Sequence, residues 1–302
     1  MRKTLVLSLV LILVSSLAAF AADPSSTSNL PKFLVFNHEE IKIGKMGEHD
    51  TMMRQLLQNV NSANADWHWI AASSVTGTSS DYLGIGMFNT YTDIEKGLQA
   101  QDKVIKTSMQ NADYARETED THQSRKITIV RLRPELSYQA EKVNFANARF
   151  WDVTIIQVKP GADDDFIDLA KDYVELHKKG NIDVSWATYS ADYGTTSPVF
   201  VYITPRQSLA ELDVDREAQY KAVFTPPVTK RLDSFSTEYM TRIESILVQV
   251  RPDISHPPQT IVAANPDFWN VKETVAESPT PKGKKKKAPV EPAAMKEKEQ
   301  PK

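Results

Sequence analysis

The sequence predicts an α+β protein of two tandem repeats, each with the element order βαββαβ, packed sheet to sheet as a barrel within one chain. The phrase VRLRPELSY at 130–138 returns as VQVRPDISH at 248–256, which is 118 residues later. Trp69 likewise returns as Trp186 at an offset of 117. Strand and helix signals also follow in the same order in both halves. Such long and nearly constant offsets indicate a duplicated domain rather than a short solenoid repeat.

Turn and helix-cap sequences extend this comparison. Lys45-Met46-Gly47 resembles Lys159-Pro160-Gly161 at an offset of 114, and Thr92-x-x-Glu95 resembles Ser208-x-x-Glu211 at 116. A hydroxyl residue followed three positions later by Glu is typical of a capping box, which begins a helix. We therefore expect a helical segment after each of these caps.

The second repeat, expected over residues 146–258, shows its elements clearly. β-branched and aromatic residues at 150–158 predict a strand. Carboxylates at 163–165 then begin a helix, because they complement its dipole, and Gly180 ends it. The remaining expected elements are strands at 184–190, 199–204 and 245–251, a helical segment after Ser208, and a helix carrying Val228, Leu232, Phe235 and Tyr239.

The first repeat, expected over residues 30–140, follows the same order. A helix is predicted by apolar residues at helical spacing, which are Met52, Met53, Leu56, Leu57 and Val60. The other expected elements are strands at 33–43, 69–75, 82–88 and 126–133, and a helical region from Thr92 to about Glu119.

The barrel prediction rests on the bare face of each sheet. One layer of helices covers one face of a four-stranded sheet and leaves the other exposed. At roughly 25 cal/mol per Å², several hundred Å² of exposed apolar sheet would forgo on the order of ten kcal/mol. We therefore expect the two bare faces to pack against each other.

The N-terminal segment carries an export signal. Residues 1–22 combine Arg2 and Lys3 with a short apolar run and a small-x-small sequence, which predicts a signal peptide cleaved near Ala21/Ala22. The expected location is periplasmic or secreted, and an uncleaved N-terminal anchor is the alternative. The apolar run is shorter than a span of about 30 Å of hydrocarbon requires. The chain contains no cysteine, so it has neither disulfides nor thiolate chemistry.

The C-terminal segment has the opposite charge from the body. Residues 272–302 are rich in Lys, Pro and Glu, which predicts a disordered tail. The cluster from Lys282 to Lys287 could bind an anionic surface, and a solubilising tail without a partner is the alternative. The net charge of −3 includes both basic ends, so the body carries about −10. An acidic body argues against nucleic acid as a partner, because such binding displaces counterions from the nucleic acid through a basic face.

The phrase VTIIQVKPGADDDFIDLAKDY at 153–173 joins a strand, a Lys-Pro-Gly turn and an acidic helix start. It resembles NIPSNAP-type and antibiotic-biosynthesis-monooxygenase-type domains, which belong to the dimeric α/β barrel superfamily of ferredoxin-like domains. The resemblance covers about residues 30–258 and implies a ferredoxin-like fold for each repeat. The superfamily includes cofactor-independent monooxygenases, haem-binding enzymes and lyases, so the resemblance does not select an activity.

A polar strand face is the first candidate site. His38, Glu40 and Lys42 alternate along the expected first strand, and the resemblance places this face inside the barrel. At the offset of 114 the same face in the second repeat carries Asp152 and Thr154. Charges in a dry core need partners or water, so we expect either a wet pocket or a strand that faces solvent. In a pocket, His38 would be the general base, because histidine titrates near neutral pH, and Asp152 or Glu40 would orient it.

Tryptophans and the remaining histidines give weaker candidates. Trp69 and Trp186 could flank a flat ligand, but core packing is the commoner role of a repeated tryptophan. His177 is a conceivable haem ligand, yet a histidine in the last turn of a helix more often stabilises the helix dipole as a cation. Haem is therefore not favoured. No H-x-H or H-x-x-x-H pair is present, so the sequence predicts no metal site.

Together these patterns predict an exported barrel protein that binds a small, partly apolar ligand. The residues expected to bind it are Glu40, Lys42, Trp69, Asp152, Thr154 and Trp186. One alternative is a cofactor-independent monooxygenase-like enzyme that uses His38. A second alternative is a non-catalytic, surface-associated interaction protein. A monomer and a homodimer are both compatible with the sequence.

Overall fold

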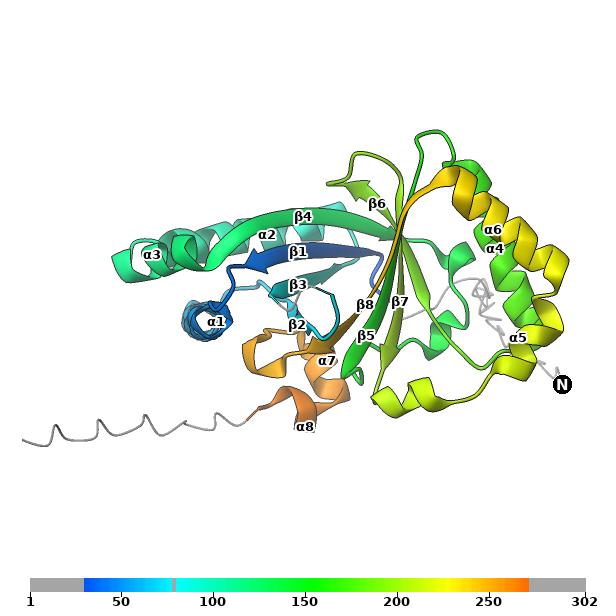
Figure 1. Cartoon of the computed structure of the whole chain (residues 1–302). Coiled ribbons are helices and arrows are strands. Elements are labelled where there is room, and N and C mark those ends of the chain that lie inside the picture. The colour runs from blue at the N-terminus through cyan, green and yellow to red at the C-terminus, as the bar shows by residue number, and fades with distance from the viewer. Residues whose placement is uncertain (1–29, 78–79, 272–302) are drawn as a thin grey trace, which may run out of the picture. The chain divides into compact units, whose positions relative to one another are not determined.

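A barrel of antiparallel strands forms the centre of the protein. The computed structural model describes residues 30–77 and 80–271, so the predicted signal peptide and tail lie outside the described residues. The strands are β1 Phe33–Ile41, β2 Ile70–Ser74, β3 Asp81–Phe88, β4 His122–Leu132, β5 Phe150–Val158, β6 Ala187–Tyr193, β7 Val199–Arg206 and β8 Met240–Val250. Figure 1 labels these strands, which close in the order β1-β3-β2-β8-β5-β7-β6-β4. No helix in the described ranges is long and apolar enough to cross a membrane.

Each repeat contributes four neighbouring strands to this barrel. The first repeat supplies β4, β1, β3 and β2, and the second supplies β8, β5, β7 and β6. The ladders β2–β8 and β4–β6 join the two repeats. Closure pairs both edge strands of each four-stranded sheet with the sheet of the other repeat. The predicted α+β fold of two βαββαβ repeats packed as one intrachain barrel is therefore confirmed.

A layer of helices covers the outside of each half of the barrel (Figure 1). The helices are α1 Met46–Ser62, α2 Tyr91–Ser108 and α3 Ala112–Thr121 on the first repeat, α4 Asp163–Gly180, α5 Glu217–Val223 and α6 Pro226–Tyr239 on the second, and α7 Gln259–Ala264 and α8 Pro266–Trp269 after the barrel. The predicted capping box at Ser208 is confirmed, although it begins a short 3₁₀ helix. In the first repeat the cap is Thr90 rather than Thr92, because its side chain accepts from the backbone N–H of Asp93.

The interior of the barrel is a packed apolar core. All eight strands supply buried inward side chains, among them Leu34, Ile70, Leu83, Val130, Trp151, Tyr189, Val201 and Val248. The ring of Trp151 lies 4.7 Å from that of Phe145, centroid to centroid. The inward strand face, which was expected to line a pocket, therefore contributes mainly to core packing.

In the structure, β1 corresponds to β5 at an offset of 117 residues. From β3 and β7 onward, the offset between the two repeats is 118 residues. The register between β1 and β4 shifts just before Ile41, where a bulge lies. The register between β5 and β8 shifts in the same way just before Val158. Gly44 and Gly161 follow these bulges with φ angles of 82° and 84°, a conformation that favours glycine. The predicted turn pairing at an offset of 114 is therefore wrong.

This correction changes which strand faces correspond. Side chains alternate between the two faces of a strand, so an error of three residues exchanges the faces. His38 shares the barrel-facing side of β1 with Leu34, a member of the barrel core. Asp152 and Thr154 lie instead on the helix-facing side of β5, the side of Ile156. The predicted correspondence between these two polar faces is wrong.

The repeated phrase noted in the sequence lies where the two repeats meet. The indole Nε1 of Trp186 donates to the carbonyl of Leu136 at 2.9 Å. The indole Nε1 of Trp69 donates to the carbonyl of Ile254, also at 2.9 Å. Each tryptophan therefore binds the phrase that ends the other repeat, and both are buried.

Candidate functional site

A cavity of about 490 Å³ lies between the outer face of the first-repeat sheet and the helices α1, α2 and α3. Its walls are largely apolar and aromatic, with Met53, Leu56 and Trp69 among the lining residues. Two glycines on β3, Gly84 and Gly86, leave the sheet side of the cavity without side chains at their positions. The volume lies within the usual range of small-molecule sites, about 300–1,000 Å³.

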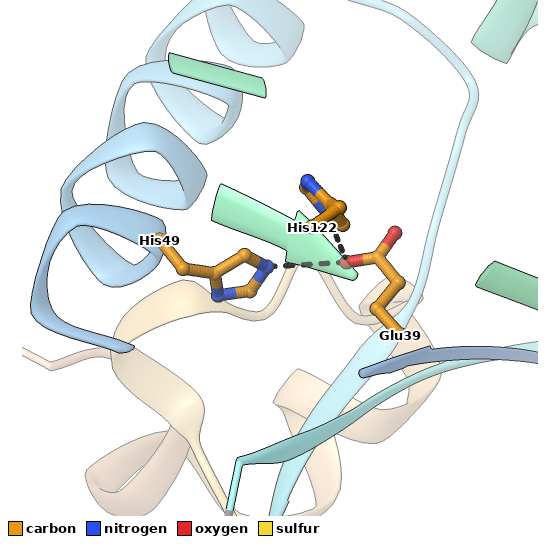
Figure 2. A group of neighbouring side chains, drawn as sticks. All are labelled: Glu39, His49 and His122. Atoms are coloured by element: carbon orange, nitrogen blue, oxygen red, sulfur yellow. Dashed lines mark hydrogen bonds and ion pairs between the residues drawn. The ribbon is translucent and has the colours of Figure 1, made fainter. Parts of the chain in front are cut away.

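A carboxylate lies between two imidazoles at this cavity (Figure 2). We call Glu39, His49 and His122 the Glu-His-His cluster; they come from β1, α1 and the first position of β4. The Oε2 atom of Glu39 is 3.1 Å from the Nε2 atom of each histidine. Glu39 and His122 line the cavity, whereas His49 is fully buried.

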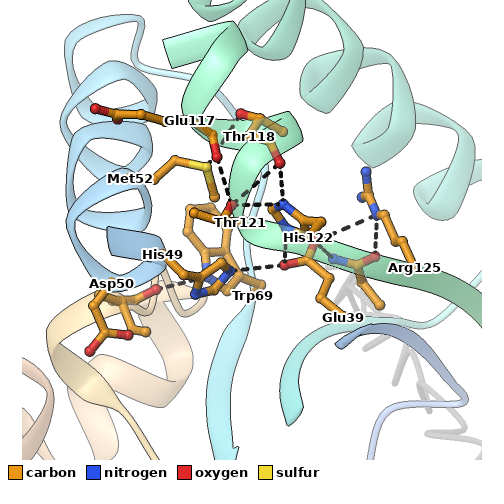
Figure 3. Close-up of polar contacts among 12 residues, drawn as sticks. Glu39, His49, Asp50, Met52, Trp69, Glu117, Thr118, Thr121, His122 and Arg125 are labelled. Carbon is orange, nitrogen blue, oxygen red and sulfur yellow. Dashed lines mark hydrogen bonds and ion pairs between the residues drawn. The ribbon is translucent and has the colours of Figure 1, made fainter. Parts of the chain in front are cut away.

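Further polar contacts hold the cluster in place (Figure 3). The other carboxylate oxygen of Glu39, Oε1, accepts from the side-chain amide of Asn37 at 2.6 Å and lies 3.5 Å from the Nε of Arg125. The Nδ1 of His122 is 2.7 Å from the backbone carbonyl of Thr118. Within the described part of the chain, the buried Nδ1 of His49 has no hydrogen-bond partner.

The electrostatics favour an ion pair between Glu39 and His122. Burial by itself raises the pKa of Glu39, but hydrogen bonds from His122, His49 and Asn37, with the charge of His122, hold it well below its usual range. Burial lowers the pKa of His122, but the hydrogen bond and charge of Glu39 raise it above its ordinary value. Both ring nitrogens of His122 face acceptors, which suits an imidazolium.

The structure places the predicted polar strand face outside this cavity. The side chain of His38 is 42% exposed, and its Nε2 lies 3.4 Å from a carboxylate oxygen of Asp81. Glu40 accepts from Gln123 at 3.0 Å, and Lys42 is exposed at the end of the strand. Of the two situations expected for this face, the solvent-facing one matches these positions. The role of His38 as a base stays a prediction.

The other predicted residues are dispersed over the molecule. Asp152 pairs with Arg206 at 2.9 Å, and the hydroxyl of Thr154 lies 3.0 Å from that of Ser245. Trp186 packs in an aromatic cluster of the second repeat. Of the seven predicted site residues, Trp69 alone lines the cavity.

His177, considered as a haem ligand, lies within the second repeat. Aromatic rings surround it, with the centroids of Tyr173 and Trp186 at 4.4 and 4.8 Å, and its Nδ1 is 2.9 Å from the Tyr173 carbonyl. Burial lowers its pKa, which disfavours the dipole-stabilising cation that the sequence suggested. His177 lines neither this cavity nor a groove between α4 and α6.

The Glu-His-His cluster was missed from the sequence because its members are distant along the chain. Two of them are ten residues apart, and the third follows 73 residues after the second. One signal was present. Glu39 shares the helix-facing side of β1 with the buried Ile41, so its charge falls on an apolar face. A charge on such a face needs buried partners.

The topology defines two fused ferredoxin-like domains whose sheets close one barrel, with a candidate site between the sheet and the helices of one repeat. No family model and no curated protein matches the sequence. Among solved structures, an anthrone oxidase-like protein aligns with a TM-score of 0.47 and 12% identity, over 75% of this chain and 94% of its own.

Two further solved structures align with lower TM-scores. Chlorite dismutase from Candidatus Nitrospira defluvii, in complex with imidazole, has a TM-score of 0.42 and 8% identity, over 77% of this chain and 94% of its own. A heme-binding protein from Thermus thermophilus has a TM-score of 0.36 and 13% identity, over 80% of this chain and 96% of its own. These similarities concern the general fold and assign no activity to this chain.

Proposed function

We propose that the protein binds a small, flat, partly apolar organic molecule in the cavity of the first repeat. One observation carries this proposal: a mostly apolar cavity of about 490 Å³ has a buried carboxylate–imidazole pair, Glu39 and His122, on its wall. Apolar walls supply affinity, and a few buried polar groups fix the orientation of a ligand. The cavity also includes Trp67 and Trp69, whose rings suit contact with a flat molecule.

The second repeat suggests a variant that closes the cavity. At the position of Gly84 it has Tyr202, since Gly84 pairs with Asn37 as Tyr202 pairs with Thr154. We expect Gly84→Tyr to fill the cavity and to weaken binding of a polycyclic phenol such as 2-naphthol by at least about tenfold, about 1.4 kcal/mol. Quenching of tryptophan fluorescence measures this binding.

His38→Ala is the matched control for this experiment. Because His38 lies outside the cavity, the variant should bind 2-naphthol as the wild type does. If His38→Ala lost 2-naphthol binding and Gly84→Tyr retained it, the cavity would be rejected as the binding site. The polar strand face with His38 would then be favoured as the site. Circular dichroism should show that both variants keep their fold. Mass spectrometry of small molecules that co-purify with the protein would identify the natural ligand.

A second candidate function is a cofactor-independent oxygenase. The observation in its favour is the pair of basic side chains on the cavity wall, Arg125 and His122, whose pKa Glu39 raises; in their charged forms they would stabilise a bound phenolate. Both groups fit anion stabilisation better than proton abstraction. Oxygen consumption with polycyclic phenols tests this function, and equal rates for the wild type and His122→Asn would reject a role of His122 in it.

The finer expectations remain part of the proposal. They are export through a cleaved signal peptide, a NIPSNAP-type relationship, and an anionic surface as partner of the lysine-rich tail. The residues of the signal peptide and the tail, 1–22 and 272–302, lie outside the described residues. Deleting 272–302 should reduce salt-dependent binding to anionic vesicles if the tail is a tether, and unchanged binding would reject that role.

A further inference from the structure

The second repeat shows what the same fold contains where the Glu-His-His cluster is absent. With the offsets of 117 in β1 and α1 and 118 in β4, the equivalent residues are Ile156, Phe166 and Met240. These three pack together in one apolar cluster of the second repeat. The fold therefore also forms with apolar side chains at these positions. Burying a carboxylate and two imidazoles instead is costly, which indicates a function for them.

The donor atoms of the cluster converge on one point. Glu39 Oε2 is 3.1 Å from both histidine Nε2 atoms, and all three atoms lie within 4.8 Å of one another. A tetrahedral ion with bonds of about 2.0–2.1 Å separates its ligand atoms by roughly 3.3 Å. Small side-chain movements would therefore bring these atoms into coordination.

The surrounding contacts match those of metal ligands. A metal-binding histidine usually donates its other ring N–H to a carbonyl or carboxylate. The Nδ1 of His122 has the Thr118 carbonyl at 2.7 Å, an arrangement that leaves Nε2 as the ligand atom. The Oε1 atom of Glu39 is held by Asn37, so Oε2 is the oxygen directed to the histidines. His49 departs from the rule, because its Nδ1 has no partner within the described residues.

We propose that Glu39, His49 and His122 bind one divalent transition-metal ion, with an open coordination position facing the cavity. Two imidazoles and one carboxylate suit Zn²⁺, Co²⁺ or Fe²⁺. The open position follows from burial: His49 closes the site from behind, whereas Glu39 and His122 line the cavity. This inference goes beyond the proposed ligand binding, because the ion needs no organic molecule to bind.

Titration of the chelator-treated, full-length protein with Co²⁺ tests this proposal. We expect one equivalent to bind and to produce the visible absorption of four- or five-coordinate Co²⁺. The triple variant E39I/H49F/H122M, which carries the residues of the second repeat, should lose this absorption. Asn37→Ala removes a contact that orients Glu39, so it should weaken binding by about 10–100-fold.

The controls separate a built site from surface binding and from misfolding. His38, which lies outside the cavity and pairs with Asp81, can be changed to Asn without touching the cluster, and the stoichiometry should stay at one. Circular dichroism and urea unfolding establish that the triple variant is folded, and Asn37→Ala retains all three ligands. Equal Co²⁺ binding by the wild type and the triple variant, or no visible absorption in the wild type, would overturn the proposal.

The test of the metal site can fail or succeed independently of the test of the proposed organic ligand. Binding of 2-naphthol is measured in parallel, with and without Co²⁺. Absence of Co²⁺ binding with normal 2-naphthol binding would reject the metal site alone. Co²⁺ binding without any affinity for 2-naphthol would reject the proposed ligand class and leave the metal site standing.

Discussion

The pKa values of two histidines in this protein, His122 and His177, shift in opposite directions from the ordinary value. The pKa of His122 is raised, because burial is outweighed by the hydrogen bond and charge of Glu39. The pKa of His177 is lowered, because burial dominates and its main polar partner is the carbonyl of Tyr173. The burial and the neighbours of each imidazole thus decide the direction in which its pKa shifts.

We predict that His177 makes stability depend on pH. Its folded pKa lies below the unfolded value of about 6.5, so the unfolded chain binds more protons between the two. Its contribution to stability is fully present above the unfolded pKa and is lost as pH falls through the folded pKa. His177→Leu should therefore flatten the decline of stability below pH 6.5.

Urea unfolding of the wild type and of His177→Leu at several pH values measures this effect. The rings that face the histidine are those of Tyr138, Tyr173, Trp186, Tyr220 and Phe224, and no carboxylate, amine or second imidazole is among them. Burial raises the pKa of Tyr173 and of Tyr220 further above the ordinary tyrosine value of about 10, which lies far outside the measured range. Parallel stability curves for the two proteins would show that His177 is not the cause.

At the scale of elements, the repeated phrases fasten one repeat to the other. The hydroxyl of Ser137 accepts from the backbone N–H of Thr188 at 2.9 Å and donates to the carbonyl of Arg133. Ser255 makes the corresponding contacts with Ala71, at 2.8 Å, and with Arg251. Each serine satisfies a buried backbone donor in a strand of the other repeat, at the point where the ladder between repeats ends.

We predict equal losses of stability from Ser137→Ala and Ser255→Ala. Each change leaves a buried N–H without its acceptor, which costs about 1–3 kcal/mol. The two sites share no partner, so the double variant should lose the sum of the single effects.

Urea unfolding compares these variants with Ser234→Ala. Ser234 is an exposed residue of α6 that bonds only within its own helix, so its removal should change stability by less than about 0.5 kcal/mol. If all three single variants were equally stable, the serines would not fasten the repeats.

At the scale of the whole molecule, each repeat depends on the other to cover its sheet. The barrel core takes buried side chains from both halves, such as Leu34 and Ile85 from one and Val153 and Ile203 from the other. Separation of the repeats would expose these residues to water, at a cost of roughly 25 cal/mol for each Å² of apolar surface. The four-stranded sheets would also regain unpaired edges.

We predict that neither half is a stable monomer on its own. Residues 30–145 and 146–271, expressed separately, should self-associate or lack cooperative unfolding, and a mixture of both should regain the circular dichroism of the intact barrel. The intact chain should unfold in one transition, with the same midpoint by tryptophan fluorescence and by circular dichroism. A half that is monomeric in size-exclusion chromatography and unfolds cooperatively would contradict this prediction.

Local patterns in the sequence were sufficient for the fold. Alternating and helical apolar spacing, with the long repeat, determined the element order and the closed barrel, because these signals reside within short segments. Boundaries were less well defined: β8 begins at Met240, five residues before the expected start, because its first residues face solvent and few of them are apolar. The face assignment of Asp152 failed because a turn of similar sequence suggested an offset of 114 instead of 117.

Tertiary structure alone decided where the candidate site lies. The sequence by itself determined that polar groups occur on the first strand, and it favoured the face that carries His38. The structure instead brings Glu39 together with His49 and His122 on the opposite face, under a layer of helices. Contacts between three separate elements depend on the register of strands and on helix packing, and neither leaves a periodic pattern in the chain.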